Sequence, residues 1–169
     1  QMCIRDRFEV QREALLAHWR SLADAPDPAT ALARAQRLRL LTAVREGPQG
    51  ARGLNARIEE LLSGRRTGPT PAWFHGRLLL ITQNSYRHRL FNGDIGICLR
   101  SEASPFSGRS EASPFSGRSE ASAPAAQDDS ATLMAWFPGD APGEVRAFHP
   151  ATLPAHDSAF AMTVHKAQG

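Results

Sequence analysis

The end of the chain constrains the fold most strongly, because an apolar run there leads directly into a cluster of polar residues. Residues 160–164 read Phe-Ala-Met-Thr-Val, a pattern typical of a short buried strand. Residues 165–169 then supply an imidazole, an ammonium group, an amide and a glycine. Ligands of open α/β sheets bind beyond the carboxyl ends of the strands. We therefore expect Thr163 to Gly169 to border a binding site, and Lys166 is the only lysine in the chain.

A second apolar run, residues 38–44, predicts another buried strand, which ends in a glycine-rich loop. The loop, residues 45–50, reads Arg-Glu-Gly-Pro-Gln-Gly and leads into a helix expected over residues 56–62. A strand, such a loop and a helix can place backbone amides beside an anion. The same pattern is also that of an ordinary connection between a strand and a helix. Arg45 is the basic residue at the end of the strand.

Two helices are expected before this strand. Residues 8–22 have amphipathic spacing, and two sets are candidates for the buried stripe: Val10, Ala14, Ala17 and Leu22, or Leu15, Trp19 and Leu22. Asp27 and Pro28 have the preferences of an N-cap and a first helical position, which predicts a second helix to about Gln36. Residues 1–7 show no periodicity and are expected to be a non-native or disordered tail.

From Trp73 onward the sequence changes to short strands separated by turns. Asn92-Gly93 is a strong hairpin signal. The predicted strands are residues 77–82, 95–99, 132–137 and 143–148, with 151–153 as a further candidate. This number of short strands predicts a small barrel. The polar loop at residues 83–89 carries Asn84, Arg87 and Arg89, which are well placed to contact a ligand.

A tandem repeat interrupts the predicted barrel. Residues 101–109 read Ser-Glu-Ala-Ser-Pro-Phe-Ser-Gly-Arg, and residues 110–118 repeat them. A segment so rich in Ser, Pro and Gly buries too little apolar area to offset the entropy lost on ordering. Residues 101–130 are therefore expected to form a disordered low-complexity loop.

Composition and charge narrow the class of protein. The chain has 169 residues, 41% of them hydrophobic, and its mean hydropathy of −0.37 is compatible with a folded core. Cys3 and Cys98 are too few and too far apart for a zinc site or a disulfide framework, so we expect no metal site and a reducing, cytoplasmic setting. Eight arginines lie between residues 34 and 66. They predict a basic face for nucleic acid, or simply reflect a GC-rich genome.

Three stretches together resemble one family. Thr163-Val-His-Lys-Ala-Gln-Gly169 resembles motif V of superfamily 1B DNA helicases, and it is most similar to the RecD-like members. The run Arg45-Glu-Gly-Pro-Gln-Gly50 with Leu54-Asn55 resembles the segment near motif IV of the same proteins. Phe91-Asn-Gly-Asp-Ile-Gly96 resembles the opening of the SH3-like barrel, called domain 2B, that is inserted in their second motor domain.

The resemblance implies an α/β fold with a partial RecA-like domain 2A and an inserted SH3-like β-barrel 2B. Residues 8–72 would belong to domain 2A, residues 73–155 to the barrel, and residues 156–169 to the return into domain 2A with motif V. Thr163 to Gly169 would therefore lie near the predicted strand of residues 38–44. The implied activity of the parent protein is ATP-dependent 5′ to 3′ DNA unwinding, as the RecD-like alpha subunit of exodeoxyribonuclease V in double-strand break repair and recombination.

The resemblance also implies roles for single residues. Thr163, His165 and Lys166 would contact single-stranded DNA, together with Asn84, Arg87 and Arg89 of the polar loop. Arg45, Gln168 and Gly169 would lie near the nucleotide, and Ala167 replaces a serine of the family. The parent protein would use ATP and Mg²⁺ and would have RecB and RecC as partners, without a membrane.

The sequence contains no G-x-x-x-x-G-K-[ST] phosphate loop, and the arginine finger of the family would follow residue 169. The segment is therefore expected to hold no complete catalytic set, to bind no cofactor and to be inactive alone. A non-enzymatic small-barrel module that binds nucleic acid or protein is the alternative.

Overall fold

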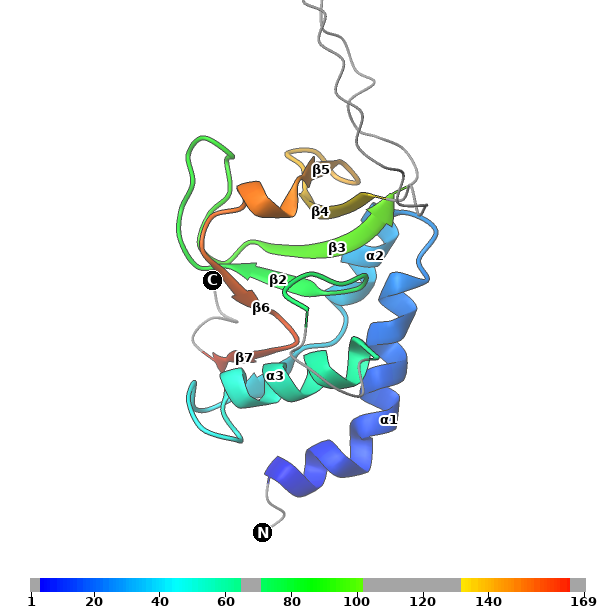
Figure 1. The fold of residues 1–169 in the computed structure, drawn as a ribbon, viewed down its shortest axis with the longest axis vertical. Helices are drawn as coiled ribbons and strands as arrows, with labels where there is room; N and C mark the ends of the chain where they lie inside the picture. Colours follow the sequence, from blue (N-terminus) through cyan, green and yellow to red (C-terminus); the bar gives the residue numbers. More distant parts are fainter. Residues whose placement is uncertain (1–3, 65–70, 102–131, 165–169) are drawn as a thin grey trace, which may run out of the picture.

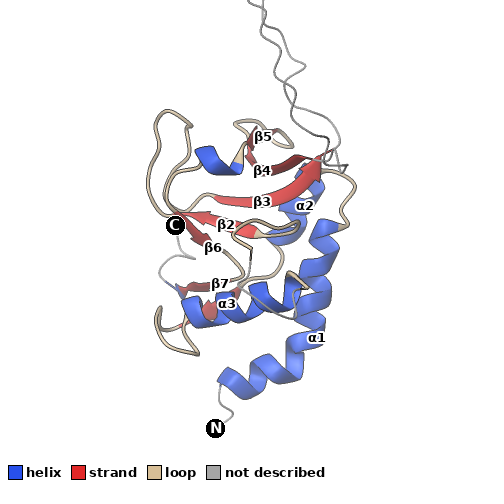
Figure 2. Cartoon of the chain, viewed as in Figure 1, coloured by secondary structure: helices blue, strands red, loops and turns tan. Residues whose placement is uncertain are grey.

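The computed structural model describes residues 4–64, 71–101 and 132–164, and it shows a mixed α/β fold, as predicted (Figures 1 and 2). Its elements are α1 (Ile4–Ala23), α2 (Pro28–Ala35), β1 (Leu40–Thr42), α3 (Ala51–Leu62), β2 (Leu78–Ile81), β3 (Ile95–Ser101), β4 (Thr132–Pro138), β5 (Val145–Phe148), the 3₁₀ helix η1 (Pro150–Thr152), β6 (His156–Ser158) and β7 (Ala161–Thr163). The strands form a two-stranded parallel sheet, β1-β7, and a five-stranded antiparallel sheet of order β5-β4-β3-β2-β6.

The parallel pair joins the two predicted strands that lie furthest apart in the sequence. Leu40 pairs with Ala161, and Thr42 pairs with Thr163. The prediction that these two strands lie close together is thus confirmed. Both strands are shorter than the apolar runs that predicted them. Leu41 and Val44 remain 47% and 55% exposed, because within the described residues β1 has only β7 beside it.

The helices form the expected caps and buried faces. Asp27 caps α2, since its carboxylate accepts hydrogen bonds from the Thr30 amide at 2.8 Å and the Thr30 hydroxyl at 2.7 Å. These bonds lower the pKa of Asp27. Of the two stripes predicted for the first helix, Leu15, Trp19 and Leu22 are buried, whereas Val10 is 76% exposed.

Helix α1 begins at Ile4 rather than at residue 8, so residues 4–7 of the expected tail continue the helix. Residues 4–7 read Ile-Arg-Asp-Arg, in which three charged residues follow one apolar residue, so the hydrophobic pattern did not mark this turn. Residues 1–3 lie outside the described part of the chain, as do residues 102–131, which carry almost all of the expected low-complexity loop.

The antiparallel sheet is buried on both faces, and this explains the continuous apolar run of β2. Leu78 and Leu80 belong to a core shared with the helices, while Leu79 and Ile81 face a second, smaller core. The helical side of the first core includes Leu16, Trp19, Leu32 and Ile58; the second core includes Leu90, Cys98, Ala135 and Phe137. Helix α2 lies against β3 and β4.

The predicted turn at Asn92-Gly93 is confirmed, and it lies just before β3, at the end of the connection from β2. Gly93 has a φ of +105°, which a side chain would strain. The Asp94 carboxylate accepts a hydrogen bond from the Phe91 amide at 2.7 Å. Gly96 is needed for another reason, because a Cβ atom there would lie 2.6 Å from the Phe137 ring.

One predicted strand was wrong. Residues 151–153 were a candidate closing strand, but residues 150–152 form η1, and the strand that follows is β6. Pro150 has no N–H for a strand ladder and is suited to the start of a helical turn. The side chain of His149 caps this turn by accepting a hydrogen bond from the Ala151 amide at 3.3 Å. β6 pairs with β2, so the antiparallel sheet extends past the expected boundary at residue 155.

Cys98 provides a test of the second core. Its side chain is fully buried, and this burial raises the pKa of the thiol to about 12. In a Cys3→Ser background, we expect Ellman's reagent at pH 8 to label Cys98 at least about 100-fold more slowly in the native chain than in urea, because the thiolate is the reactive form. Equal rates in buffer and in urea would contradict this burial.

Within residues 4–64, 71–101 and 132–164, no helix combines the length and the apolar character needed to cross a bilayer.

Candidate functional site

A cleft of about 360 Å³ lies beside the carboxyl ends of the two parallel strands. It is bordered by α3, by β6 and by the end of β7. Thr163, on β7, lines this cleft, and so does Arg45, which follows β1. Two residues that were expected to contact different ligands, DNA and nucleotide, are therefore brought to one cleft by the pairing of β1 with β7.

Arg45 is held across the cleft by an acidic residue of β6. Its Nη2 lies 3.1 Å from Oδ2 of Asp157, and its Nε lies 4.0 Å from Oε1 of Glu46. The side chains of Arg45 and Asp157 are 56% and 40% exposed. An ion pair this exposed contributes only about 0–1 kcal/mol. An incoming phosphate could thus displace Asp157 from Arg45 at little cost.

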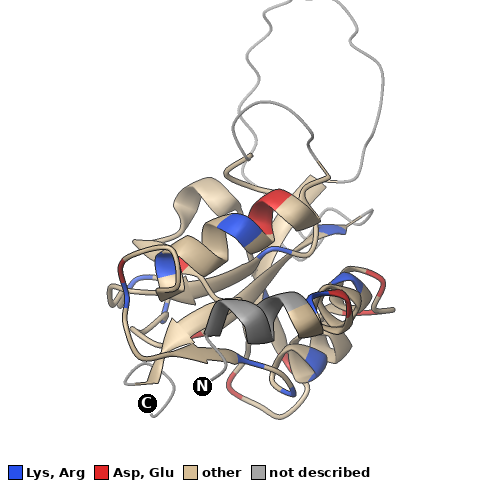
Figure 3. Ribbon diagram, turned by 90° about the horizontal axis from the view of Figure 1, so that it is seen from below, with Lys and Arg blue, Asp and Glu red and all other residues tan. Residues whose placement is uncertain are grey.

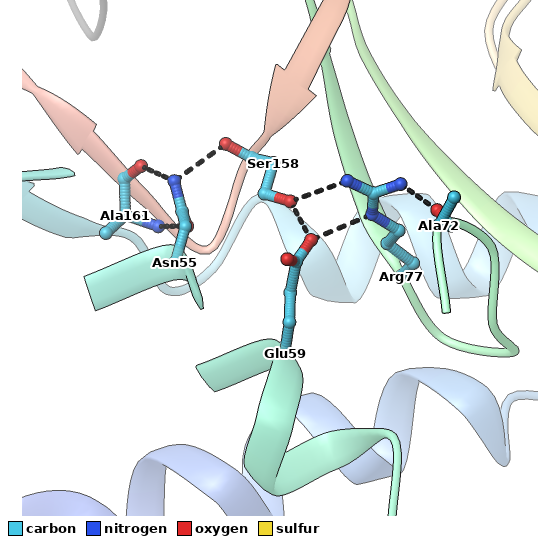
Figure 4. Close-up of polar contacts among 6 residues, drawn as sticks. All are labelled: Asn55, Glu59, Ala72, Arg77, Ser158 and Ala161. Carbon is cyan, nitrogen blue, oxygen red and sulfur yellow. Dashed lines mark hydrogen bonds and ion pairs between the residues drawn. The ribbon is translucent and has the colours of Figure 1, made fainter. Parts of the chain in front are cut away.

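A polar network in the wall of the cleft connects α3 to both sheets (Figure 4). Asn55 accepts a hydrogen bond from the Ala161 amide at 2.7 Å and donates to the carbonyls of Ala161 at 2.8 Å and Ser158 at 3.0 Å. Its side chain thereby fixes the short connection between β6 and β7. The position of Thr163 depends on this connection, because β7 begins at Ala161.

The same network continues to β2 through a half-buried ion pair. Arg77 Nε donates to Glu59 Oε1 at 2.9 Å, and these side chains are only 13% and 16% exposed. The hydroxyl of Ser158 also donates to Glu59, and Arg77 Nη2 donates to that hydroxyl at 3.2 Å. Arg77 Nη1 donates to the carbonyl of Ala72 (Figure 4). The guanidinium also lies over the Trp73 ring, 5.5 Å from its centroid.

The sequence reasoning did not find Asn55, Glu59, Arg77, Asp157 or Ser158. One signal was available, because Asn55 and Glu59 are spaced i, i+4 and therefore lie on one face of α3. Two polar residues with this spacing beside Leu54 and Ile58, both buried, indicate a polar contact with another element.

The glycine-rich loop after β1 is folded on itself. The amides of Gly50, Ala51 and Arg52 donate to the carbonyls of Gly47, Val44 and Arg45, respectively, at 3.0, 3.1 and 3.0 Å. Of the two interpretations of this loop, the structure favours a strand-to-helix connection, because these amides already have acceptors. Helix α3 begins at Ala51 rather than at residue 56, since the loop carbonyls satisfy the first amides of the helix.

Gly53 gives a test of this closed loop. In a helix, replacing an unhindered glycine with alanine stabilises by about 1 kcal/mol. A Cβ atom on Gly53, however, would lie 2.4 Å from the carbonyl oxygen of Gly47 and 2.9 Å from Cα of Pro48. We expect Gly53→Ala to lower the free energy of unfolding by about 1–3 kcal/mol in urea denaturation. A Gly53→Ala variant with a higher free energy of unfolding would contradict this, because it would mean that the loop does not close against α3.

The other predicted DNA contacts lie away from the cleft, on the loop between β2 and β3 (Figure 1). Asn84 accepts a hydrogen bond from the Asn92 amide at 2.7 Å. Arg89 forms an ion pair with Asp140 at 3.2 Å, and Arg87 is exposed. None of these three residues lines the cleft with Thr163. His165, Lys166, Gln168 and Gly169 lie outside the described residues.

The arginines of the basic stretch are distributed over several elements. Arg34 donates to the carbonyl of Ser21 at 3.2 Å, and Arg52 pairs with Glu46 at 3.1 Å. Figure 3 shows basic and acidic positions interspersed along the ribbon. Within the described residues, several of these arginines therefore serve internal contacts, and the cleft receives Arg45, Arg52 and Arg77.

Comparison with known proteins identifies the relatives of this chain. No protein-family model matches it. It is 29% identical over 135 residues to the RecBCD enzyme subunit RecD of Haemophilus influenzae. It is 44% identical over 71 residues to RecD of Mycobacterium tuberculosis, and 37% identical over 97 residues to RecD of Mycolicibacterium smegmatis. The chain is RecD-like.

The aligned regions cover 78%, 41% and 54% of this chain, respectively. They cover only 15%, 12% and 17% of the three RecD subunits, so this RecD-like chain spans less than a fifth of the length of these relatives. The family resemblance stated from the three sequence stretches is thus confirmed.

Proposed function

We propose that this chain is a segment of an ATP-dependent 5′ to 3′ DNA helicase, the RecD-like subunit of an exodeoxyribonuclease V that acts in double-strand break repair and recombination. The parent protein would bind ATP and Mg²⁺ and would assemble with RecB- and RecC-like subunits. The observation that carries the proposal is the pairing of β1 with β7, which places Arg45 and Thr163 on one cleft in a RecD-like chain.

In this proposal, β1, α3 and β7 are part of the RecA-like domain 2A, and the antiparallel sheet is the inserted SH3-like barrel 2B. The second core supports such a division, because residues of the sheet and its loops alone form it, while the other face of the sheet packs on the helices. The segment itself would neither hydrolyse ATP nor unwind DNA, because it contains no phosphate loop.

The geometry of the cleft supports a coupling role. Thr163 is the last residue of β7, which Asn55 ties to α3, and Arg45 follows the adjacent strand β1. A nucleotide phosphate that attracts Arg45 would weaken its contact with Asp157 on β6. Since β6 and β7 are joined by the connection that Asn55 holds, a change at Arg45 would reach the DNA-contacting residues through that short connection.

The test uses the complete parent protein. We expect Thr163→Ala, and the double variant His165→Ala with Lys166→Ala, to lower the stimulation of ATP hydrolysis by single-stranded DNA at least about tenfold, because they remove phosphate contacts. Hydrolysis without DNA should stay within twofold, and Thr163→Ser should keep the stimulation. Unchanged stimulation in both variants would overturn the assignment of these residues.

The same preparation tests the alternative. A parent protein that hydrolyses no ATP with or without DNA, and whose gene encodes no phosphate loop, would instead be a non-enzymatic module that binds nucleic acid or protein through its small barrel.

A further inference from the structure

The loop between β2 and β3 carries an exposed aromatic pair that the proposed cleft does not use. Tyr86 is 80% exposed and Phe91 is 46% exposed. Their rings lie edge to face, with centroids 6.1 Å apart and an interplanar angle of 79°. Exposing an aromatic ring forgoes roughly 2 kcal/mol of burial energy, so two exposed rings side by side indicate a ligand-binding surface.

The backbone of this loop is held rigidly below the exposed rings. Ser85 and Leu90 exchange two backbone hydrogen bonds, at 2.7 and 3.1 Å, so that residues 86–89 form a tight turn. Leu90 is fully buried in the core of the sheet. The Ser85 hydroxyl contacts His88 Nδ1 at 2.9 Å. Tyr86 is thus presented at the tip of a turn that is anchored on both sides.

Arg146 of β5 fixes the far side of the turn. Its Nη1 donates to the carbonyl of His88 at 3.2 Å, and its Nη2 donates to the carbonyl of Arg89 at 3.0 Å. Arg89 has a φ of +52°, a conformation that costs a non-glycine residue energy and persists only where its surroundings hold it. A preorganised turn loses little entropy when it binds a ligand.

The charges around the rings select the ligand. Residues 83–92 contain two arginines and no acidic residue. Arg89 is already paired with Asp140 at 3.2 Å. Arg87 is exposed, and among the residues that the structure describes no ion pair or hydrogen bond occupies it. An exposed guanidinium one residue from an exposed aromatic ring matches a phosphate next to an unstacked base.

We infer that Tyr86 and Phe91 form a base-stacking platform for single-stranded nucleic acid, with Arg87 as its phosphate contact and with Arg89 and Arg146 as positioning residues. This inference rests on the proposed function and refines it in two respects. It adds the two aromatic residues to the DNA-contacting surface, and it separates Arg87, which is available to a ligand, from Arg89, which the Asp140 contact and the turn already engage.

Two labelled oligonucleotides of equal length test the platform by fluorescence anisotropy on the 169-residue chain. One is oligo-dT and the other is an abasic strand with the same number of phosphates. We expect Tyr86→Ala to weaken oligo-dT binding about tenfold and to leave binding of the abasic strand unchanged, because stacking needs a base. Tyr86→Phe should bind as the unaltered chain does. Since Tyr86 is exposed, all variants should have the same thermal unfolding midpoint.

The arginines provide a second readout. Arg87→Ala should weaken both oligonucleotides equally and reduce the slope of log affinity against log salt by about one, whereas Asp140→Ala should not weaken either. The inference is overturned if Tyr86→Ala binds oligo-dT normally, or if it weakens the abasic strand to the same extent. The proposed function fails by a separate measurement: the parent protein would show no DNA-stimulated ATP hydrolysis. That result does not depend on how the Tyr86 variants bind the oligonucleotides.

Discussion

Replacing Phe160 with alanine should lower the free energy of unfolding by about 3–5 kcal/mol, because a large buried ring is removed from the core. The Phe160 side chain is 1% exposed and packs edge to face against Trp19, with ring centroids 5.3 Å apart. It precedes β7 and belongs to the core that α1 shares with the two sheets, so its removal leaves a cavity there.

Urea denaturation monitored by tryptophan fluorescence measures this effect, because Trp19 lies next to the substituted position and reports on its unfolding. Val10→Ala is the matched control, because Val10 is 76% exposed and should change the free energy of unfolding by less than about 0.5 kcal/mol. A loss below about 1 kcal/mol for Phe160→Ala would mean that β7 does not pack on α1 as described.

Replacing Asn55 with leucine should cost about 3 kcal/mol, although leucine is a good helix former of similar size. Asn55 is 8% exposed and makes three hydrogen bonds to backbone groups of Ser158 and Ala161. Leucine would leave these buried groups without that partner, and each orphaned group costs about 1–3 kcal/mol. Glu60→Ala, at an exposed position of the same helix, should be nearly neutral.

Hydrogen exchange adds a local readout to this comparison. In the Asn55→Leu variant, the amide of Ala161 should exchange faster than in the unaltered chain by a larger factor than the amides of β3 do, because Asn55 accepts its hydrogen bond directly. A uniform change over the whole chain would indicate only a general loss of stability, and it would contradict a specific role for Asn55 in holding β7.

The parts of the fold that local sequence determines were predicted well. Asp27 and Pro28 marked the start of α2, and Asn92-Gly93 marked the turn before β3, because caps and turns depend on the backbone preferences of neighbouring residues. The contact between β1 and β7 was predicted from the similarity of the two motifs to those of one family. The apolar runs alone predicted two buried strands without specifying that they pair.

The features that were missed depend on contacts between distant residues. Helix α3 begins early because carbonyls of the preceding loop accept its first amides, and the edge beside β2 is occupied by β6 rather than by residues 151–153. Asn55 was counted only as part of a family motif. Its role became clear once the connection between β6 and β7 was found beside it, at a sequence separation of 103 residues from Ser158.

The strands β2 and β6 are neighbours, with Leu79 opposite Ser158 and the Ala159 amide bonded to the carbonyl of Leu78. The first strand of the antiparallel sheet along the chain, β2, and the last, β6, therefore lie side by side. A piece of polypeptide with adjoining ends can be acquired, lost or exchanged during evolution without rethreading the host chain around it. In the division proposed above, with the sheet as an insert, a short bridge from α3 to β7 would rejoin the host chain, but the helices would lose the core that they share with Leu78 and Leu80.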